Sequence, residues 1–211
     1  MIQTYANKLY ECCEWIMKLA YLNLLWILFT LAGVVVLGIF PATVATFTVA
    51  RKWVQGESDI PIFRTFFHSY KAEFWKSQIL GFITLIIGVA LALYIYIFSS
   101  QTAMLAVILK SVAFLLFFVY IWILVFVFPM FVHYKLDVYS YVKNTVFVTI
   151  MNPVPTLFCI FGMALFGLIL GYLPGLIVVF GISAPVFWIT LHTQRVFRKL
   201  EEKQLSLVAG E

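Results

Sequence analysis

Long apolar segments, separated by short stretches of polar or turn-forming residues, dominate the hydrophobic pattern of the chain. A helix needs about 20 apolar residues to cross a bilayer core of roughly 30 Å. The segments that meet this requirement are residues 77–98, 103–132, 154–171 and 174–193. Short connections at 99–102 and 171–175 join them in pairs, and the second contains Pro174 between two glycines. Such stretches end helices, so the pattern predicts two tight helical hairpins.

The first apolar region, residues 19–50, allows two interpretations. It is too long for one ordinary span and short for two. A single span would place the N-terminus outside. A hairpin would have one helix at about 12–31, a bend at Gly33 and Gly38, and a second helix at about 40–54. We expect the hairpin. The predicted fold class is therefore all-α, a polytopic transmembrane helical bundle of six membrane helices in three hairpins, with five spans as the alternative.

Composition supports residence in a membrane. Of the 211 residues, 64% are hydrophobic and only 11% are charged. Soluble domains carry about 25% charged residues, and the mean hydropathy here is +1.04. A soluble protein of this size buries only roughly 70% of its surface, so the apolar excess must face lipid. We expect one integral membrane domain over residues 1–211, with the bilayer as its first partner.

Basic residues predict the orientation of the chain. There are 14 Lys and Arg against 9 Asp and Glu, for a net charge of +5. Those outside the N-terminal segment lie mostly in three stretches, namely Arg51, Lys52, Arg64, Lys71, Lys76, Lys135, Lys143, Arg195, Arg198, Lys199 and Lys203. The connections at 99–102 and 171–175 carry none. By the positive-inside rule the charged stretches are cytoplasmic, including a tail at 195–211, and the two connections are external. The hairpin would place the N-terminus in the cytoplasm too. The same clustering beside apolar segments argues against binding of nucleic acid.

A weak internal repeat accompanies the predicted hairpins. Pro41, Pro129 and Pro185 occupy similar settings in the three helices that run toward the cytoplasm. Pro41 suits the first turn of a helix, where its missing N–H would be unpaired anyway. Arg51 follows Pro41 by ten residues, and Arg195 follows Pro185 by ten. Three duplicated hairpins would explain this spacing, although proline is common enough in membrane helices for chance to explain it as well.

The predicted cytoplasmic segment at 55–76 is amphipathic. Its aromatic residues fall on one face of a helix, at Phe63, Phe66, Phe67, Tyr70 and Phe74. Its basic residues Arg64, His68 and Lys71 fall on the other, and Pro61 suits the first helical turn. The segment is either an interfacial helix with its aromatic face among lipid headgroups, a docking element for a cytoplasmic partner, or an arginine–phosphate lipid site.

Residue patterns typical of enzymes are missing from the sequence. It has no Gly-rich phosphate loop and no HExxH, GxSxG or CxxC motif. The acidic residues lie outside the predicted membrane cores, whereas ion-coupled carriers usually hold a carboxylate there. We therefore expect no catalytic, cofactor-binding or metal-binding residues. Some polar residues do lie in apolar segments, and we expect them to form hydrogen bonds between packed helices: Asn23, Thr30, Thr43, Thr46, Asn152 and Thr156.

A series of short motifs resembles the YesL-like family of small bacterial membrane proteins. The motifs are Asn-Leu-Leu-Trp at 23–26, Gly-Ile-Phe-Pro-Ala-Thr at 38–43, Val-Ala-Arg-Lys-Trp at 49–53 and Phe-Arg-Thr-Phe-Phe-His-Ser-Tyr-Lys at 63–71. Family members commonly read Leu-Pro after the first helix, where this chain has Leu-Ala-Gly at 31–33. The candidate functional residues that the resemblance implies are Pro41, Thr43, Arg51, Lys52, Arg64 and Lys71.

The resemblance also implies a location and a role. Family members are bacterial plasma-membrane proteins, often encoded beside carbohydrate ABC transporters. The expected function is therefore a non-enzymatic accessory or regulatory component of carbohydrate transport, with an ABC permease as a partner. The alternatives are an independent carrier of a small solute, with a site built near 38–41 and 183–185, and a membrane scaffold protein.

Overall fold

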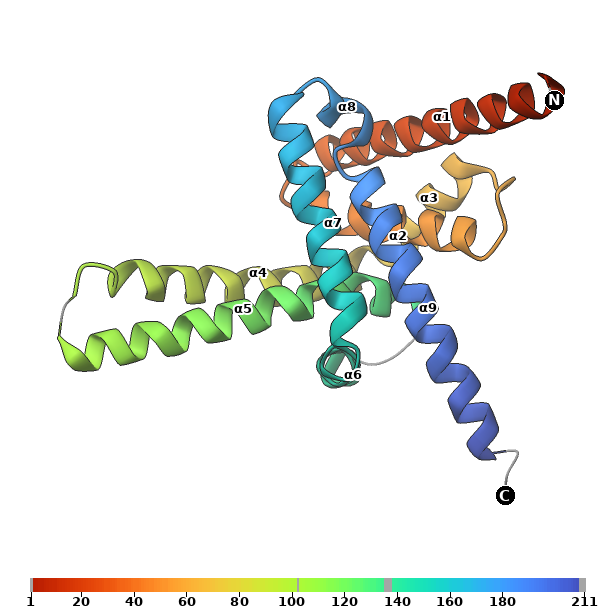
Figure 1. The fold of residues 1–211 in the computed structure, drawn as a ribbon. Helices are drawn as coiled ribbons and strands as arrows, with labels where there is room; N and C mark the ends of the chain where they lie inside the picture. The colour runs from red at the N-terminus through yellow and green to blue at the C-terminus, as the bar shows by residue number, and fades with distance from the viewer. Residues whose placement is uncertain (1, 102, 135–137, 209–211) are drawn as a thin grey trace.

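The structure is a computed structural model that describes residues 2–101, 103–134 and 138–208, and in these residues the chain forms nine helices and no strand (Figure 1). The helices are α1 (Ile2–Ala32), α2 (Ile39–Val54), α3 (Ile62–Ala72), α4 (Phe74–Ile97), α5 (Met104–His133), α6 (Val138–Met151), α7 (Pro153–Tyr172), α8 (Leu176–Phe180) and α9 (Ser183–Val208). The predicted all-α class is confirmed. The cytoplasmic charge predicted at Lys135 lies outside the described residues.

The first apolar region is a helical hairpin, as predicted, but α1 begins about ten residues earlier than expected, at Ile2. The turn of this hairpin needs glycine at 33 and 38 because a side chain at either position would meet nearby backbone. A Cβ atom on Gly33 would lie 2.4 Å from the Cα of Gly38. The left-handed conformations fall on Val34 (φ 56°) and Val35 (φ 62°). These φ values strain a β-branched residue. Both side chains are exposed, and the backbone of the turn is held by hydrogen bonds such as that from the N–H of Val35 to the carbonyl of Thr30 at 2.9 Å.

α3 folds back along α2, and this position conflicts with the predicted six-span arrangement. The hydroxyls of Thr48 and Ser69 are 2.8 Å apart, and Tyr70 Oη donates to the carbonyl of Phe29 at 3.3 Å. At the start of α4, Gln78 Nε2 donates to the carbonyl of Leu37. The predicted six-span arrangement would require the 33–38 turn to lie on one side of the membrane and the whole 55–76 segment to lie on the other. The structure instead packs the end of α3 and the start of α4 against this turn.

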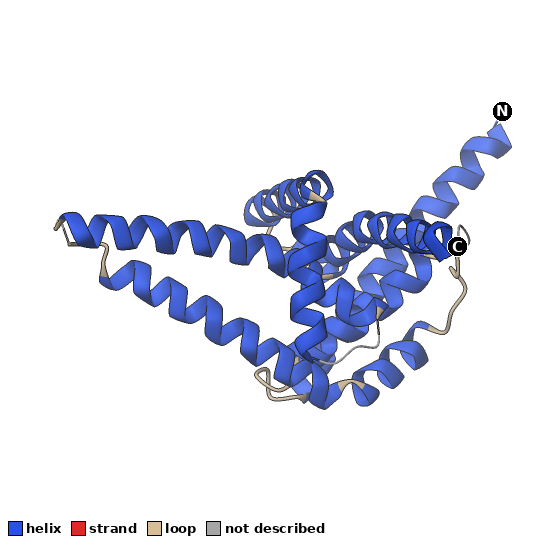
Figure 2. Cartoon of the chain, turned by 90° about the horizontal axis from the view of Figure 1, so that it is seen from below, coloured by secondary structure: helices blue, strands red, loops and turns tan. Residues whose placement is uncertain are grey.

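α4 and α5 form a long antiparallel hairpin that extends away from the other helices (Figures 1 and 2). Tyr120 ties the pair together, since its hydroxyl donates to the carbonyl of Thr84 at 2.7 Å. A Cβ atom on Gly88 would lie 2.6 Å from the same hydroxyl oxygen, so the close approach depends on glycine there. Both helices agree within three residues with the predicted segments at 77–98 and 103–132.

The predicted helix at 174–193 is wrong as a single element. The chain forms the five-residue α8, breaks at Gly181 and Ile182, and starts again as α9. α9 then continues through Arg195 to Val208, so the described part of the predicted cytoplasmic tail at 195–211 is helical and continuous with α9. The physical reason is a side chain of α1, Asn23, which hydrogen-bonds the backbone at the break and is described below.

Four helices are long and apolar enough to cross a membrane, within Asn7–Ala32, Phe74–Ile97, Met104–His133 and Pro153–Tyr172. The chain is thus a helical membrane protein, as its composition predicts. α2 has only 16 residues, and α9 is interrupted at its start and becomes polar and charged in its second half. Neither qualifies, so the predicted count of six spans is not confirmed.

Two apolar clusters form the core where the helices converge. One joins α2, α5 and α9 through residues such as Phe47, Phe126 and Phe197. The other joins α1, α2 and α3 around Leu22 and Phe66, both 0% exposed. α2 therefore lies at the centre of the fold, with a cluster on each side.

The structure shows the predicted proline repeat in two of the three helices. Pro41 and Pro185 are each the third residue of a helix, and each precedes an arginine by ten residues. Pro129 lies inside α5, near its end, and so occupies a different setting. The similarity is limited to α2 and α9.

Candidate functional site

The six residues singled out by the sequence lie at three separate places. Pro41 and Thr43 are at the start of α2, where Pro41 is buried. The Thr43 hydroxyl donates to the carbonyl of Ile39 at 2.7 Å and accepts a hydrogen bond from Trp26 Nε1 at 3.1 Å. Thr43 therefore ties α2 to Trp26 of α1.

Arg51 and Lys52 are at the other end of α2. Arg51 is half-buried, and its Nη1 donates to the carbonyl of Val132 in the last turn of α5 at 2.8 Å. Its Nε is buried and has no hydrogen-bond partner. Lys52 lies at the surface, with its Nζ 3.4 Å from a carboxylate oxygen of Glu57. Such an exposed pair contributes little stability, so Arg51 is the more informative of the two.

Arg64 and Lys71 are exposed on α3, and no ion pair involves either among the described residues. On the opposite, aromatic face of α3, Phe66 is buried and Tyr70 is half-buried, and their rings lie 5.2 and 5.0 Å from that of Phe29. Phe63 and Phe67 on the same face are 51% and 45% exposed. The predicted aromatic face is thus confirmed, except that the helix ends before its last member, which belongs to α4. This face packs against both α2 and α1.

A polar cavity of about 590 Å³ lies between α1, the ends of α2 and α5, and α9. Its polar lining consists of Gln55, His133, Gln194, Arg195, Arg198 and Glu201. Its aromatic lining consists of Trp15, Trp53 and Phe187. Arginine and tryptophan are the side chains most often found at binding hot spots, so this cavity is the best candidate for a ligand site in the described part of the chain.

His133 organises one wall of the polar cavity. Its Nε2 lies 2.9 Å from a carboxylate oxygen of Glu201, and its Nδ1 lies 3.3 Å from Nε2 of Gln194. An amide nitrogen only donates, so Nδ1 accepts and the imidazole proton on Nε2 faces the carboxylate. Next to this wall, burial raises the pKa of the Tyr134 phenol and the Glu201 carboxylate raises it further, against a smaller opposing effect of Arg51. The phenol therefore stays neutral near pH 7.

The aromatic side of the polar cavity is a cluster of three rings. The Trp15 and Trp53 rings meet edge to face, with centroids 5.7 Å apart, and Phe187 lies 5.4 Å from Trp15. Trp53 is only 4% exposed, and its indole Nε1 has no hydrogen-bond partner. A buried N–H without an acceptor costs free energy, so nearly all such groups in proteins are paired.

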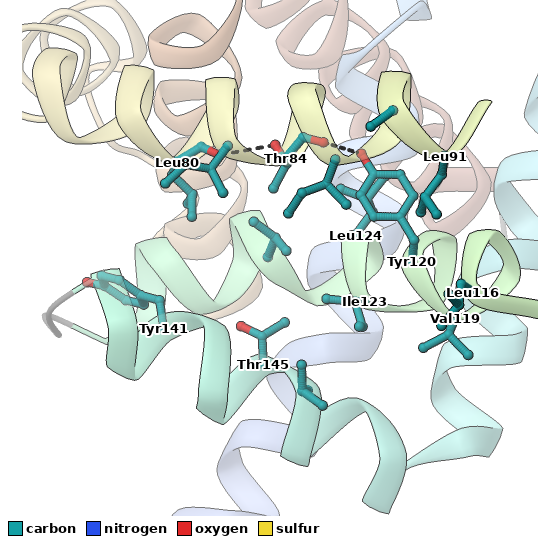
Figure 3. A pocket seen from close by; sticks show the side chains of 15 residues that line it. Leu80, Thr84, Leu91, Leu116, Val119, Tyr120, Ile123, Leu124, Tyr141 and Thr145 are labelled. Atoms are coloured by element: carbon teal, nitrogen blue, oxygen red, sulfur yellow. Dashed lines mark hydrogen bonds between the residues drawn. The ribbon is translucent and has the colours of Figure 1, made fainter. Parts of the chain in front are cut away.

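A second cavity, here called the hairpin cavity, lies between α4, α5 and α6 and measures about 510 Å³ (Figure 3). Its few polar groups are already occupied. The Thr84 hydroxyl donates to the carbonyls of Leu80 and Gly81, and Tyr120 reaches across to the Thr84 carbonyl. The remaining lining is almost entirely aliphatic, so this cavity suits hydrocarbon and offers no reactive group.

Asn23 makes four hydrogen bonds to the backbone of another part of the chain. It is 1% exposed and reaches from α1 to the break between α8 and α9. Its Nδ2 donates to the carbonyls of Ile177 and Val178, at 3.0 and 2.7 Å. Its Oδ1 accepts from the backbone N–H groups of Ile182 and Ser183, at 2.8 and 3.3 Å. One side chain thus pairs backbone groups that a broken helix would leave exposed to lipid.

The predicted role of polar residues between helices is confirmed for Asn23 and Thr43 but wrong for others. Thr46, Asn152 and Thr156 each donate to the carbonyl four residues earlier in the chain. Thr30 is buried, and its hydroxyl has no hydrogen-bond partner. Hydrogen-bonding a local carbonyl is the usual alternative for a helical threonine.

The sequence did not reveal the members of the polar cavity. Trp15, His133, Gln194 and Glu201 come from α1, α5 and α9, which meet only in the fold. One signal was available, because Leu191, Arg195 and Arg198 share a face if α9 continues through them. Among the described residues, no group of three or more His, Cys, Asp or Glu side chains could hold a metal ion.

Comparison with known proteins places the chain in a family. Residues 19–95 match the family described as "Protein of unknown function, DUF624". Three proteins of Bacillus subtilis (strain 168), each described as uncharacterized, are similar over most of their length. YteU is 38% identical over 84% of this chain and 79% of its own, and YesL is 40% identical over 74% of each. YesV is 37% identical over 86% of this chain and 87% of its own. No solved structure matches. The chain belongs to the YesL-like family of membrane proteins, whose function is unknown.

Proposed function

We propose that the protein is a non-enzymatic accessory component of a carbohydrate ABC transporter in the bacterial plasma membrane and that it contacts the permease through α3. The family resemblance supplies the kind of partner, because family members are often encoded beside such transporters. The observation that carries the contact is the unpaired basic face of α3, with Arg64 and Lys71 exposed.

The packing of α3 supports this proposal. A helix of 11 residues is marginal in water by itself, but Phe66 is fully buried and the ring of Phe29 lies against it. The helix is therefore held in shape before any partner arrives, which lowers the entropic cost of binding. Phe63 and Phe67 are stacked on one another and are 51% and 45% exposed beside the basic face. Exposed aromatic rings beside unpaired cations suit an acidic, partly apolar partner surface.

The test is a pull-down of the tagged protein in mild detergent from cells grown on the inducing sugar, with mass spectrometry of the bound proteins. We expect a carbohydrate ABC permease to be recovered with the native chain and lost with Arg64→Glu/Lys71→Glu. A matched control is Lys8→Glu/Lys143→Glu, which makes the same change in charge at exposed positions on α1 and α6.

Loss of the permease in the α3 variant alone would support the proposal. Equal loss in both variants would show that only net charge matters, and recovery of the native chain without any permease would contradict the proposal. In the latter case, transport of a solute by the purified protein in liposomes would favour an independent carrier.

A further inference from the structure

The polar cavity continues into an apolar one. A third cavity, here called the α8 cavity, measures about 480 Å³ and lies between α1, α7, α8 and α9. Phe187 and Leu191 of α9 line both the polar cavity and the α8 cavity. On α1, Trp15 lines the polar cavity, and Leu19, one turn further along, lines the α8 cavity. The two cavities are therefore successive parts of one groove between α1 and α9.

The two ends of this groove differ in chemistry. The α8 cavity is lined by aliphatic and aromatic side chains and has almost no polar surface. The polar end carries Arg195 and Arg198, both exposed. Arg198 is only loosely paired, with its Nε 3.8 Å from Glu202 in an exposed contact that contributes little. A ligand that fills the groove must therefore combine an anionic group with a hydrocarbon chain.

The acidic side chain that lines the polar cavity, Glu201, is hydrogen-bonded to His133 and, among the described residues, forms no ion pair with Arg195 or Arg198. The Glu201 carboxylate accepts a hydrogen bond from Nε2 of His133 at 2.9 Å, and Gln194 donates one to Nδ1 on the other side of the imidazole. The two arginines remain available for an anion. The buried Nε1 of Trp53, which lines the same cavity, has no acceptor within the protein.

The position of the groove matches that of a membrane lipid. His133 is the last residue of the span Met104–His133 and lines the polar cavity. The polar cavity therefore lies where a membrane helix reaches the headgroup region, and tryptophan is enriched at this depth. The α8 cavity lies beside α7, which is itself a candidate span.

We propose that the groove between α1 and α9 binds an anionic phospholipid. Its phosphate contacts Arg195 and Arg198, and one acyl chain passes Phe187 and Leu191 into the α8 cavity. Clusters of Arg or Lys at the end of a membrane helix bind anionic headgroups in this way. The site is distinct from the basic face of α3, so it stands or falls independently of the proposed contact with a transporter.

The test is native mass spectrometry of the full chain in mild detergent, titrated with phosphatidylglycerol or with zwitterionic phosphatidylcholine of the same acyl chains. We expect phosphatidylglycerol to bind at least about tenfold more tightly. Arg195→Gln/Arg198→Gln should weaken its binding by roughly ten- to thirtyfold, since each basic residue near an anionic headgroup contributes on the order of 1 kcal/mol. The matched control Arg64→Gln/Lys71→Gln removes the same charge from α3 and should leave the affinity unchanged within about twofold.

Two further arms separate a lipid from a soluble phosphate ester. Leu191→Gln places a polar group where the acyl chain passes and should weaken phosphatidylglycerol binding without removing a charge. Glycerol 1-phosphate, which has the headgroup chemistry but no chain, should not compete at equal concentration. Equal binding of both lipids, equal loss in the two double variants, or full competition by glycerol 1-phosphate would overturn the proposal. Each variant is first checked for an unchanged melting temperature, and all the exchanged arginine and lysine side chains are exposed.

Discussion

The hydrogen bonds of Asn23 lead to the sharpest prediction about stability. Replacing Asn23 by Ala removes the side chain that pairs four backbone groups at the break between α8 and α9. One of the four, the Ile177 carbonyl, keeps a second partner, because it also accepts from the N–H of Gly181 at 2.9 Å. The Val178 carbonyl and the N–H groups of Ile182 and Ser183 lose the partner that the fold provides.

The expected cost follows from two limits. A buried group left unsatisfied costs about 1–3 kcal/mol, which for three groups gives an upper limit well above 3 kcal/mol. Hydrogen bonds between membrane helices average only about 0.6 kcal/mol each, because the unfolded chain in the membrane finds partners too. Four such bonds set the lower limit near 2 kcal/mol. We expect Asn23→Ala to lower the free energy of unfolding by about 2–4 kcal/mol, between these limits.

The assay is unfolding of the purified protein by SDS titration from mild detergent, followed by tryptophan fluorescence. Asn23→Leu restores most of the lost volume without restoring a hydrogen bond, so it separates packing from pairing. The control is Asn144→Ala, at an exposed asparagine of α6, which should change the free energy of unfolding by less than about 0.5 kcal/mol. If Asn23→Leu were as stable as the native chain, the loss in Asn23→Ala would be a packing effect and the reasoning from hydrogen bonds would be refuted.

Two further predictions concern packing and orientation. Gly162→Ala places a Cβ atom 2.1 Å from the Trp188 indole nitrogen, so it should destabilise the α7–α9 contact by about 1–3 kcal/mol. The control Gly167→Ala meets nothing within 4 Å and should not destabilise the protein. Equal melting temperatures of the two variants in thermal unfolding would contradict this prediction. The orientation can be tested in a chain whose native cysteines are replaced by serine. In intact cells, Ser100→Cys should react with a membrane-impermeant maleimide and Gln55→Cys should not. The reverse labelling would contradict the predicted orientation.

Apolar length predicted the helices that lie mainly against lipid and failed where a distant side chain decides the structure. The segment expected at 103–132 is the helix Met104–His133, because most of its side chains are not buried within the protein and its apolar length decides the structure. The segment expected at 174–193 is also apolar overall, yet it breaks at Gly181. The break is stabilised by Asn23, more than 150 residues earlier. Hydropathy averages along the chain carry no information about such a partner.

The candidate site shows the same limit. Arg51, Arg64 and Lys71 are indicated by short contiguous motifs that resemble those of the YesL-like family. The polar cavity depends instead on His133 and Glu201, which are 68 residues apart and meet only because α9 continues as a helix beyond Arg195. The sequence does not show that this stretch continues as a helix, so it does not relate that face to the end of α5.

The lengths of α2 and α3 constrain how the first part of the chain lies in the membrane. At 1.5 Å per residue, α2 is about 24 Å long and α3 about 16 Å, both shorter than a hydrocarbon core of roughly 30 Å. α2 nevertheless extends from the 33–38 turn to the loop before α3, and α3 returns to that turn. The turn and the loop are therefore separated by less than the thickness of the core. The six-span prediction required them to lie on opposite surfaces. A unit in which α2 and α3 reach only part of the way across the bilayer satisfies both the contacts and the exposed charges of α3.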